Sequence, residues 1–349
     1  MKKVFFTLVT ATVAATMSFA QSSLLATLSH DGNISAYYGA NALKQAVEAA
    51  QAGDVVTLSS GQFNATDITK PITLRGAGMS ISTDSIGSHE ATIIQNAFNI
   101  NISDTLSGRV IMEGLYMKNN VMYGGHIKNA QFLKCRFLRF IPNTGAKMTN
   151  SSFIHCRIYD GFELLANSNA YFINSLVGSP KSAQSSSNIE FDNCFVKFDY
   201  GSSYGRYASN VINSYYKNCI IQVTSTSSNY IPSSCTAYNC IGLGYSGIFN
   251  YMTSSNSTNK YVSTISSVFK KYSITDKGTY IADVYNFELT ENAAKTYLGT
   301  DGTQVGIYGG NLVYDEAPTI PQITKCNVAA KSTADGKLSV DIEVKAAEY

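Results

Sequence analysis

Basic side chains recur at one spacing in the middle of the sequence. A Lys-x-Arg pair is followed 21 residues later by a His-x-Arg pair. If both pairs occupy the same offset in adjacent turns of a repeat, they lie about 4.8 Å apart. Such a strip could bind an anionic group, with a lysine or histidine as general base. The candidate catalytic residues are Lys134, Arg136, His155 and Arg157, with Asp160 at the edge.

The same residues admit a second interpretation. Arg139 and Asp160 are also 21 residues apart, so they could form an ion pair between adjacent turns on a solvated face. An exposed ion pair contributes little to stability. Arg139 is otherwise a candidate for glycan binding, and the sequence leaves both interpretations open.

Tyrosines interleaved with Ser, Thr and Asn form a second candidate surface. Tyrosine rings can stack on sugars while their hydroxyls form hydrogen bonds. Polar stretches of this kind are also common as solvated connections. The candidate glycan-binding residues are Tyr200, Tyr204, Tyr207, Tyr230 and Tyr245.

A repeat of about 21 residues must position these side chains. The motif aromatic-x-x-Cys-x-apolar, seen in Phe132–Phe137 and Phe153–Ile158, returns along the chain. A repeat this short, with no helical period, predicts a parallel β-helix of stacked coils. Its key position is Gly114, Cys135, Cys156, Ser175, Cys194, Cys219 and Cys240.

A bend is expected just before the key position. Residues alternate between the two faces of a strand, so the aromatic residue and the key residue three positions later cannot both face inward without one. Asn174, Asn193, Asn218 and Asn239 stand at this bend, and asparagine tolerates the left-handed conformation. We expect their amides to form a ladder from coil to coil.

Both ends of the solenoid require caps. Apolar residues at helical spacing between Asn41 and Gln51 predict a helix over the first coil. At the other end, two alternating segments flank Asp335-Gly336 and predict a hairpin. We expect this hairpin to cap the last coils or to attach to a partner. The predicted regions are 1–20 signal peptide, 21–39 lead segment, 40–310 β-helix with its helix at 41–52, and 311–349 linker and hairpin.

The segments Ala42–Leu58 and Pro71–Gly76 resemble the N-terminal signature of the pectin-lyase-like superfamily of right-handed parallel β-helices. Within it, they are most similar to the chondroitinase-B-like and alginate-lyase-like branch of polysaccharide-degrading bacteria. Gly299–Gly310 is similar to the closing coil of that group.

The resemblance implies an acidic polysaccharide substrate and β-elimination, for which Lys134 or His155 would be the base and the strip the uronate site. Calcium would be possible only in such a lyase, and the family's cluster of carboxylate ligands has no counterpart in the sequence. The paired aspartates of a polygalacturonase-type hydrolase are also missing. No other cofactor is indicated.

Cysteine usage allows two arrangements. Cysteines at the key position would line the core as small buried side chains, which favours reduced thiols. Disulfides are the alternative in an exported protein, with Cys235 and Cys240 the best-placed pair.

The N-terminus predicts export. Lys2 and Lys3 precede the apolar stretch Val4–Ala15 and the cleavage site Ser18-Phe19-Ala20, as in a bacterial secretory signal peptide. No later stretch has the length of a spanning helix. A net charge of +2 argues against nucleic acid or an anionic membrane as partner.

Three functions fit these observations. The first is a periplasmic, cell-surface or secreted protein that binds polysaccharide without an intact catalytic centre. The second is a divergent polysaccharide lyase, and the third is a structural or adhesion module. A fold by itself does not decide among them.

Overall fold

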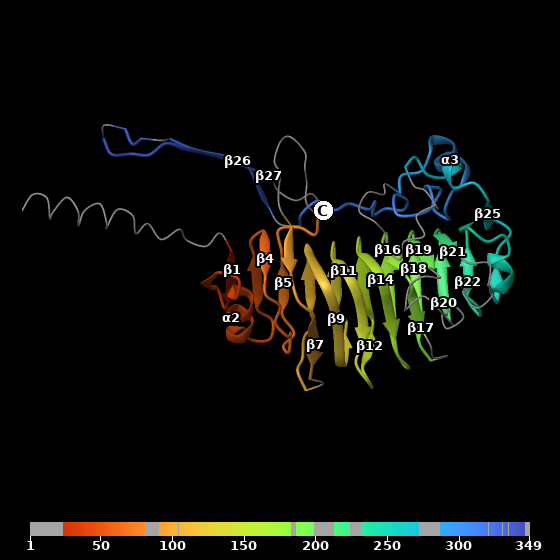
Figure 1. Cartoon of the computed structure of the whole chain (residues 1–349), viewed down its shortest axis with the longest axis horizontal. Coiled ribbons are helices and arrows are strands. Elements are labelled where there is room, and N and C mark those ends of the chain that lie inside the picture. The colour runs from red at the N-terminus through yellow and green to blue at the C-terminus, as the bar shows by residue number, and fades with distance from the viewer. Residues whose placement is uncertain are drawn as a thin grey trace, which may run out of the picture.

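The chain folds as a right-handed parallel β-helix of about eight turns, which confirms the predicted fold class. Figure 1 shows an elongated body in which successive coils stack side by side. The structure is a computed structural model. It describes residues 24–80, 91–103, 105–182, 186–198, 213–223, 232–271, 287–319, 321–329, 331–333 and 335–345.

The first sheet has 12 strands, one from nearly every coil. Apart from the antiparallel strands β1 and β2 at its N-terminal end, its strands pair in parallel. In spatial order it contains β2 (Asn33–Tyr38), β1 (Leu25–His30), β3 (Val55–Leu58), β5 (Thr73–Arg75), β8 (Ile111–Glu113), β10 (Gln131–Leu133), β13 (Ser151–Ile154), β15 (Asn169–Ile173), β18 (Asn188–Asp192), β20 (Ser214–Lys217), β22 (Thr236–Tyr238) and β24 (Ser254–Ser255).

The second sheet has 13 parallel strands and forms the other side of the coils. Its main path is β25 (Lys260–Val262), β23 (Ile241–Leu243), β21 (Ile220–Val223), β19 (Phe195–Phe198), β16 (Leu176–Gly178), β14 (Arg157–Leu164), β11 (Arg136–Pro142), β9 (Leu115–Lys128), β6 (Thr92–Ile94) and β4 (Gly61–Phe63). β7 (Phe98–Ile102), β12 (Lys147–Thr149) and β17 (Pro180–Ser182) pair beside this path.

The core between the sheets follows the predicted repeat. The rings of Phe132, Phe153, Phe172, Phe191 and Tyr216 stack in sequence, with centroids 4.5 to 5.2 Å apart. All five are essentially buried. Each coil therefore adds one aromatic layer to a continuous stack.

The cysteines at the key position are free thiols. Cys135 and Cys156 donate to carbonyl oxygens of the preceding coil, each at 3.3 Å. Burial raises the pKa of the Cys135 thiol to about 12. Cys235 and Cys240 are also buried and form no disulfide, so the alternative that the sequence left open for this pair is not realised.

A helix covers the first coil, as expected. α2 (Ala42–Ala49) buries Ala42, Leu43, Ala46 and Val47 against the N-terminal strands. At the opposite end, the short 3₁₀ helix η3 (Ile248–Tyr251) places Ile248 in the core over Gly242. This helix lies in the connection between β23 and β24, and Ile248 thus extends the core near the C-terminal end of the solenoid.

The predicted bend is present in each of these coils. Asn174, Asn193, Asn218 and Asn239 have φ between 42° and 54°. The expected ladder forms only in part, because Asn218 donates to Asn193 at 3.1 Å whereas Asn174 donates to a later segment of the chain.

The C-terminal hairpin does not cap the last coils, and that expectation was wrong. β26 (Gln322–Val328) pairs with β27 (Val340–Lys345), and the hairpin projects from the N-terminal half of the solenoid (Figure 1). Val340, Ile342 and Val344 are 51–60% exposed. The reason is that residues 297–317 run back along the solenoid before the hairpin begins.

Candidate functional site

Lys134 and His155 occupy the bend position of their coils. Their φ angles, 49° and 51°, match those of the asparagines in the following coils. Lys134 precedes β11 and His155 precedes β14, so both side chains leave the solenoid at the corner between the two sheets. The repeat therefore brings the two candidate bases together, as the sequence predicted.

Residues 297–317, hereafter the C-terminal strap, cover this corner. The strap follows helix α3 (Glu291–Thr296) and crosses the bends in reverse chain order, running toward the N-terminal coils along the upper edge of the body (Figure 1). Thr300 N donates to Asn218 Oδ1 at 2.9 Å. Asn174 Nδ2 donates to the carbonyl oxygens of Ile307 and Gly309 at 2.8 and 2.7 Å.

The strap also engages both candidate bases. Lys134 Nζ lies 2.7 Å from Asp315 Oδ2 and 3.0 Å from the carbonyl oxygen of Ala317. His155 Nε2 is hydrogen-bonded to the carbonyl oxygen of Leu312 at 3.2 Å. The Lys134 side chain is only 11% exposed, and His155 is buried. Neither group faces a space that a polysaccharide could enter.

Burial lowers the pKa of His155, and neighbouring Lys134 adds to this effect. The hydrogen bond to Leu312 and the charge of Asp315 oppose it. The ring is therefore neutral near pH 7. A neutral imidazole suits a general base, but the contact with the strap blocks its approach to a substrate.

The two arginines of the strip lie on the outward face of the second sheet. The Arg136 guanidinium stacks between the rings of Tyr116 and Tyr159, 4.0 and 4.7 Å from their centroids. Arg157 is buried, and its Nη2 lies 3.5 Å from Oε1 of Glu316 in the strap. Both cations are held by contacts within the protein.

Arg139 and Asp160 form the expected pair between adjacent coils. Arg139 Nε donates to Asp160 Oδ2 at 2.7 Å, and the carboxylate is almost completely buried. The pair is therefore more shielded than the solvated contact that the sequence suggested.

The tyrosine candidates are only partly placed. Tyr200, Tyr204, Tyr207 and Tyr230 lie outside the described residues. Tyr245 follows β23 at the C-terminal end of the solenoid, with its ring centroid 6.3 Å from that of Tyr251. A side-chain hydrogen bond with Tyr251 raises the pKa of Tyr245.

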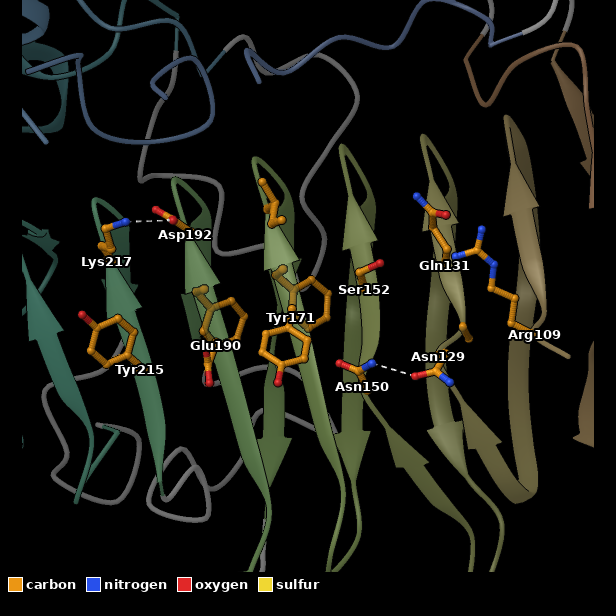
Figure 2. A pocket seen from close by; sticks show the side chains of 14 residues that line it. Arg109, Asn129, Gln131, Asn150, Ser152, Tyr171, Glu190, Asp192, Tyr215 and Lys217 are labelled. Carbon is orange, nitrogen blue, oxygen red and sulfur yellow. Dashed lines mark hydrogen bonds and ion pairs between the residues drawn. The ribbon is translucent and has the colours of Figure 1, made fainter. Parts of the chain in front are cut away.

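A groove lies on the outward face of the first sheet. A cavity of about 570 Å³ spans β10 to β20, and one of about 610 Å³ adjoins it over β18 to β22. The two share Glu190 and Tyr215, so together they form one shallow groove across the coils. Figure 2 shows its polar side chains in rows along the stacked strands.

Strand register fixes these rows. In the middle row Gln131, Ser152, Tyr171, Glu190 and Tyr215 are consecutive partners on five adjacent strands. In the next row Asp192 pairs with Lys217, and the carboxylate and ammonium groups are 3.2 Å apart. The repeat thus places tyrosine, glutamate and tyrosine side by side (Figure 2).

Asparagines form one edge of the groove and orient its floor. Asn150 Nδ2 donates to Asn129 Oδ1 at 2.6 Å. Asn169 Nδ2 donates to the Tyr171 hydroxyl at 3.0 Å, and Asn188 Nδ2 donates to Glu190 Oε1 at 2.8 Å. This edge is a second asparagine row, distinct from the one at the predicted bend.

The sequence contained a signal for this groove that our prediction missed. An asparagine stands three residues before the core aromatic in five coils: Asn129, Asn150, Asn169, Asn188 and Asn213. The residue just before each aromatic points outward because strand side chains alternate, and it supplies the floor of the groove.

Within the described residues, no three His, Cys, Asp or Glu side chains gather as a set that could hold a metal ion. The same part of the chain has no helix of the length and apolarity needed to span a bilayer. Searches against protein-family models, curated proteins and solved structures find no match to this chain. The resemblance to the pectin-lyase-like superfamily therefore stays a prediction, and the fold is a parallel β-helix with a covered and an open face.

Proposed function

We propose that this chain is an exported protein that binds polysaccharide in the open groove of the first sheet, without using the basic strip as a catalytic centre. The observation that carries this proposal is the row Tyr171, Glu190 and Tyr215 on three adjacent strands. It combines two aromatic rings with a hydrogen-bond acceptor in an accessible groove.

The spacing of the row suits an extended chain of sugars. Adjacent coils are about 4.8 Å apart, so Tyr171 and Tyr215, two coils apart, lie about 9.6 Å from each other. A polysaccharide lying along the solenoid axis would meet a ring, a carboxylate and a second ring in turn. Tyrosine offers both an apolar face and a hydroxyl to such a ligand.

The groove has the preorganisation that sugar binding requires. Hydrogen bonds from Asn169 and Asn188 fix the Tyr171 hydroxyl and the Glu190 carboxylate before a ligand arrives. The strands themselves are rigid, because each pairs on both sides. Little conformational entropy is then lost on binding.

The geometry does not favour a lyase that acts through the basic strip. Such a lyase needs a base near the sugar C5 proton and a cation for the uronate. Lys134 and Arg157 instead contact Asp315 and Glu316 of the strap. A substrate would have to displace this segment of the strap to reach them.

Affinity electrophoresis, in which the protein migrates through a gel that contains a soluble polysaccharide, tests the proposal. We expect retardation of the wild-type chain, and at least about tenfold weaker affinity for Tyr171→Ala and Tyr215→Ala, which corresponds to about 1.4 kcal/mol. Tyr261→Ala is the matched control, since Tyr261 is 38% exposed on β25 of the other sheet.

Folded wild-type protein that binds no polysaccharide would contradict the proposal and favour a structural or adhesion module. If Tyr261→Ala lowers the affinity for polysaccharide as much as the groove variants do, the groove is not the binding site. Export is tested separately by sequencing the N-terminus of the mature protein, which we expect to begin at Gln21.

A further inference from the structure

The groove carries carboxylates at its centre. Glu190 lies between Tyr171 and Tyr215 in the middle row, and Asp192 follows two residues later on the same strand, facing the same side. Asp192 is paired with Lys217, so the nearest ammonium group is already partly neutralised. Arg109 also lines the groove, beside Gln131 at the opposite end from Lys217 (Figure 2). The two cations of the groove thus stand at its ends, and its centre is not a cationic surface.

The basic side chains of the covered face also form ion pairs within the protein. Lys134 and Arg157 contact Asp315 and Glu316, and Arg139 contacts Asp160. On the open face Arg75 Nε lies 2.8 Å from Glu113 Oε2. Arg136 and Arg157 stand at the coil spacing on the covered face, but they are held by tyrosine rings and by Glu316 of the strap.

A polyuronate would meet repulsion in this groove. Each sugar of such a chain carries a carboxylate, and a chain along the solenoid axis would bring several of them near Glu190, whereas Asp192 is already paired with Lys217. Like charges at separations of a few ångströms repel, and the repulsion is reduced but not removed by solvent. An uncharged polysaccharide carries no such cost.

The carboxylates are well suited to sugar hydroxyls. An ionised carboxylate only accepts hydrogen bonds, and it accepts them more strongly than a neutral oxygen does. Asn188 donates a hydrogen bond to Glu190 Oε1. This contact orients the carboxylate, so that Oε2 can accept a hydrogen bond from a sugar hydroxyl. Tyrosine hydroxyls and asparagine amides can donate as well as accept.

We propose that the groove selects an uncharged, hydroxyl-rich polysaccharide and that Glu190 excludes polyuronates. This inference rests on the proposed function and specifies its ligand class. It departs from the acidic substrate that the family resemblance implies.

Affinity electrophoresis with two groups of gels tests it. The neutral group contains a soluble β-glucan, a xylan and a mannan, and the acidic group contains pectate and alginate. We expect the wild-type chain to bind at least one neutral polysaccharide at least tenfold more tightly than either polyuronate, at low and at moderate ionic strength.

Charge variants then identify the excluding group. Glu190→Gln should raise affinity for a polyuronate at least threefold at low salt, with a smaller gain at high salt because the repulsion is screened. Glu288→Gln is the matched control. It changes the net charge equally, but Glu288 pairs with Lys270 away from the groove, so it should leave polyuronate binding unchanged.

Different results would overturn the proposed function and the proposed ligand class. Wild-type binding that is tighter for pectate or alginate and is lost in Tyr171→Ala would overturn the ligand class while leaving the groove as the site. Identical polyuronate affinities for Glu190→Gln and the wild type would overturn the role of Glu190. Absence of binding to every polysaccharide would overturn the proposed function and this inference with it.

Discussion

The outward faces of the two sheets come from the same coils but carry different chemistry. On the first sheet the outward row Tyr171, Glu190 and Tyr215 is polar and lines a groove. On the second sheet the outward row of the same coils is apolar and buried, comprising Leu176, Phe195, Ile220 and Ile241.

The apolar row has a covering segment. Leu176, Phe195 and Ile220 join a second hydrophobic cluster with Phe287, Leu289 and other residues of the C-terminal region, including Val305 and Ile307 of the strap. Phe195 and Phe287 have ring centroids 4.5 Å apart. One face of the solenoid is thus part of the folding core, while the other is open to solvent.

This difference shows how a repeat separates stability from function. Inward residues must match the coil above and below, so they vary little along the stack. Outward residues are free of that requirement, and each face can acquire its own composition. The basic strip lies on the covered face, where its charges hold the strap.

Replacing an aromatic side chain on each face should give the largest contrast. Phe195→Ala removes a buried ring from the second cluster and should lower the free energy of unfolding by about 3–5 kcal/mol. Tyr215→Ala, in the groove, should lower it by no more than about 1 kcal/mol. Urea denaturation followed by circular dichroism measures both, and similar losses would show that the two faces do not differ as described.

Removing the hydrogen bonds that hold the strap should have the next largest effect on the free energy of unfolding. Asn174→Ala loses the bonds to Ile307 and Gly309 and places alanine at φ 42°, so the loss should be about 2–4 kcal/mol. Asn150→Ala is the matched control, because Asn150 also has a positive φ, 50°, but lies exposed beside the groove.

Both substitutions carry a similar backbone cost, and Asn150→Ala also loses its exposed hydrogen bond to Asn129, so their difference is a lower bound on the contribution of the strap contacts. We expect Asn174→Ala to be less stable than Asn150→Ala by about 1–3 kcal/mol. Limited proteolysis should cut the strap sooner in Asn174→Ala alone. Equal stability and equal cleavage would mean that the strap is held by its apolar residues rather than by these bonds.

The sequence predicted the elements that depend on the repeat. The period of Cys135, Cys156 and Cys219 gave the coil, and the position of Asn174 gave the bend. These features are local or recur at one spacing, so a single sequence exposes them. The structure adds that the aromatic residues of this frame stack from coil to coil.

The covering of the basic strip was harder to predict because it depends on contacts between distant segments. Nothing local shows that Asp315 meets Lys134, since the two are 181 residues apart. One signal was present: Leu176, Phe195, Ile220 and Ile241 are apolar at an outward position, which indicates a cover. The polar residues at the outward position of the first sheet, compared with this apolar row, indicate that the first sheet carries the open face.

Acid should weaken the covered face more than the open one. Burial lowers the pKa of His155, so the unfolded chain binds a proton there before the native chain does. Stability is therefore fully present above the ordinary histidine pKa of 6.5 and is lost as the pH falls through that value toward the lowered one. Lys134 and Asp315 of neighbouring elements also face the ring and act in opposite directions.

Thermal unfolding between pH 7.5 and pH 5 measures this effect. His155→Asn keeps a residue suited to the bend but removes the titrating ring, so its melting temperature should fall less over this range than that of the wild type. His126→Asn is the control, because His126 lies at β9 and contacts Thr149 rather than the strap. If the melting temperatures of the wild type and His155→Asn fall equally over this pH range, His155 is not the group responsible for the loss of stability.

The smallest effect concerns how the asparagine row orients the groove. Asn169→Ala removes the bond to the Tyr171 hydroxyl but leaves the ring, so polysaccharide affinity should fall only about twofold to fivefold, equivalent to about 0.4–1 kcal/mol. Tyr171→Phe removes the same bond from the other side. If the bond serves only to hold the hydroxyl, the double variant should bind no more weakly than Tyr171→Phe alone. An additive loss would instead mean that Asn169 contacts the ligand directly, and the row would then belong to the binding surface rather than to its support.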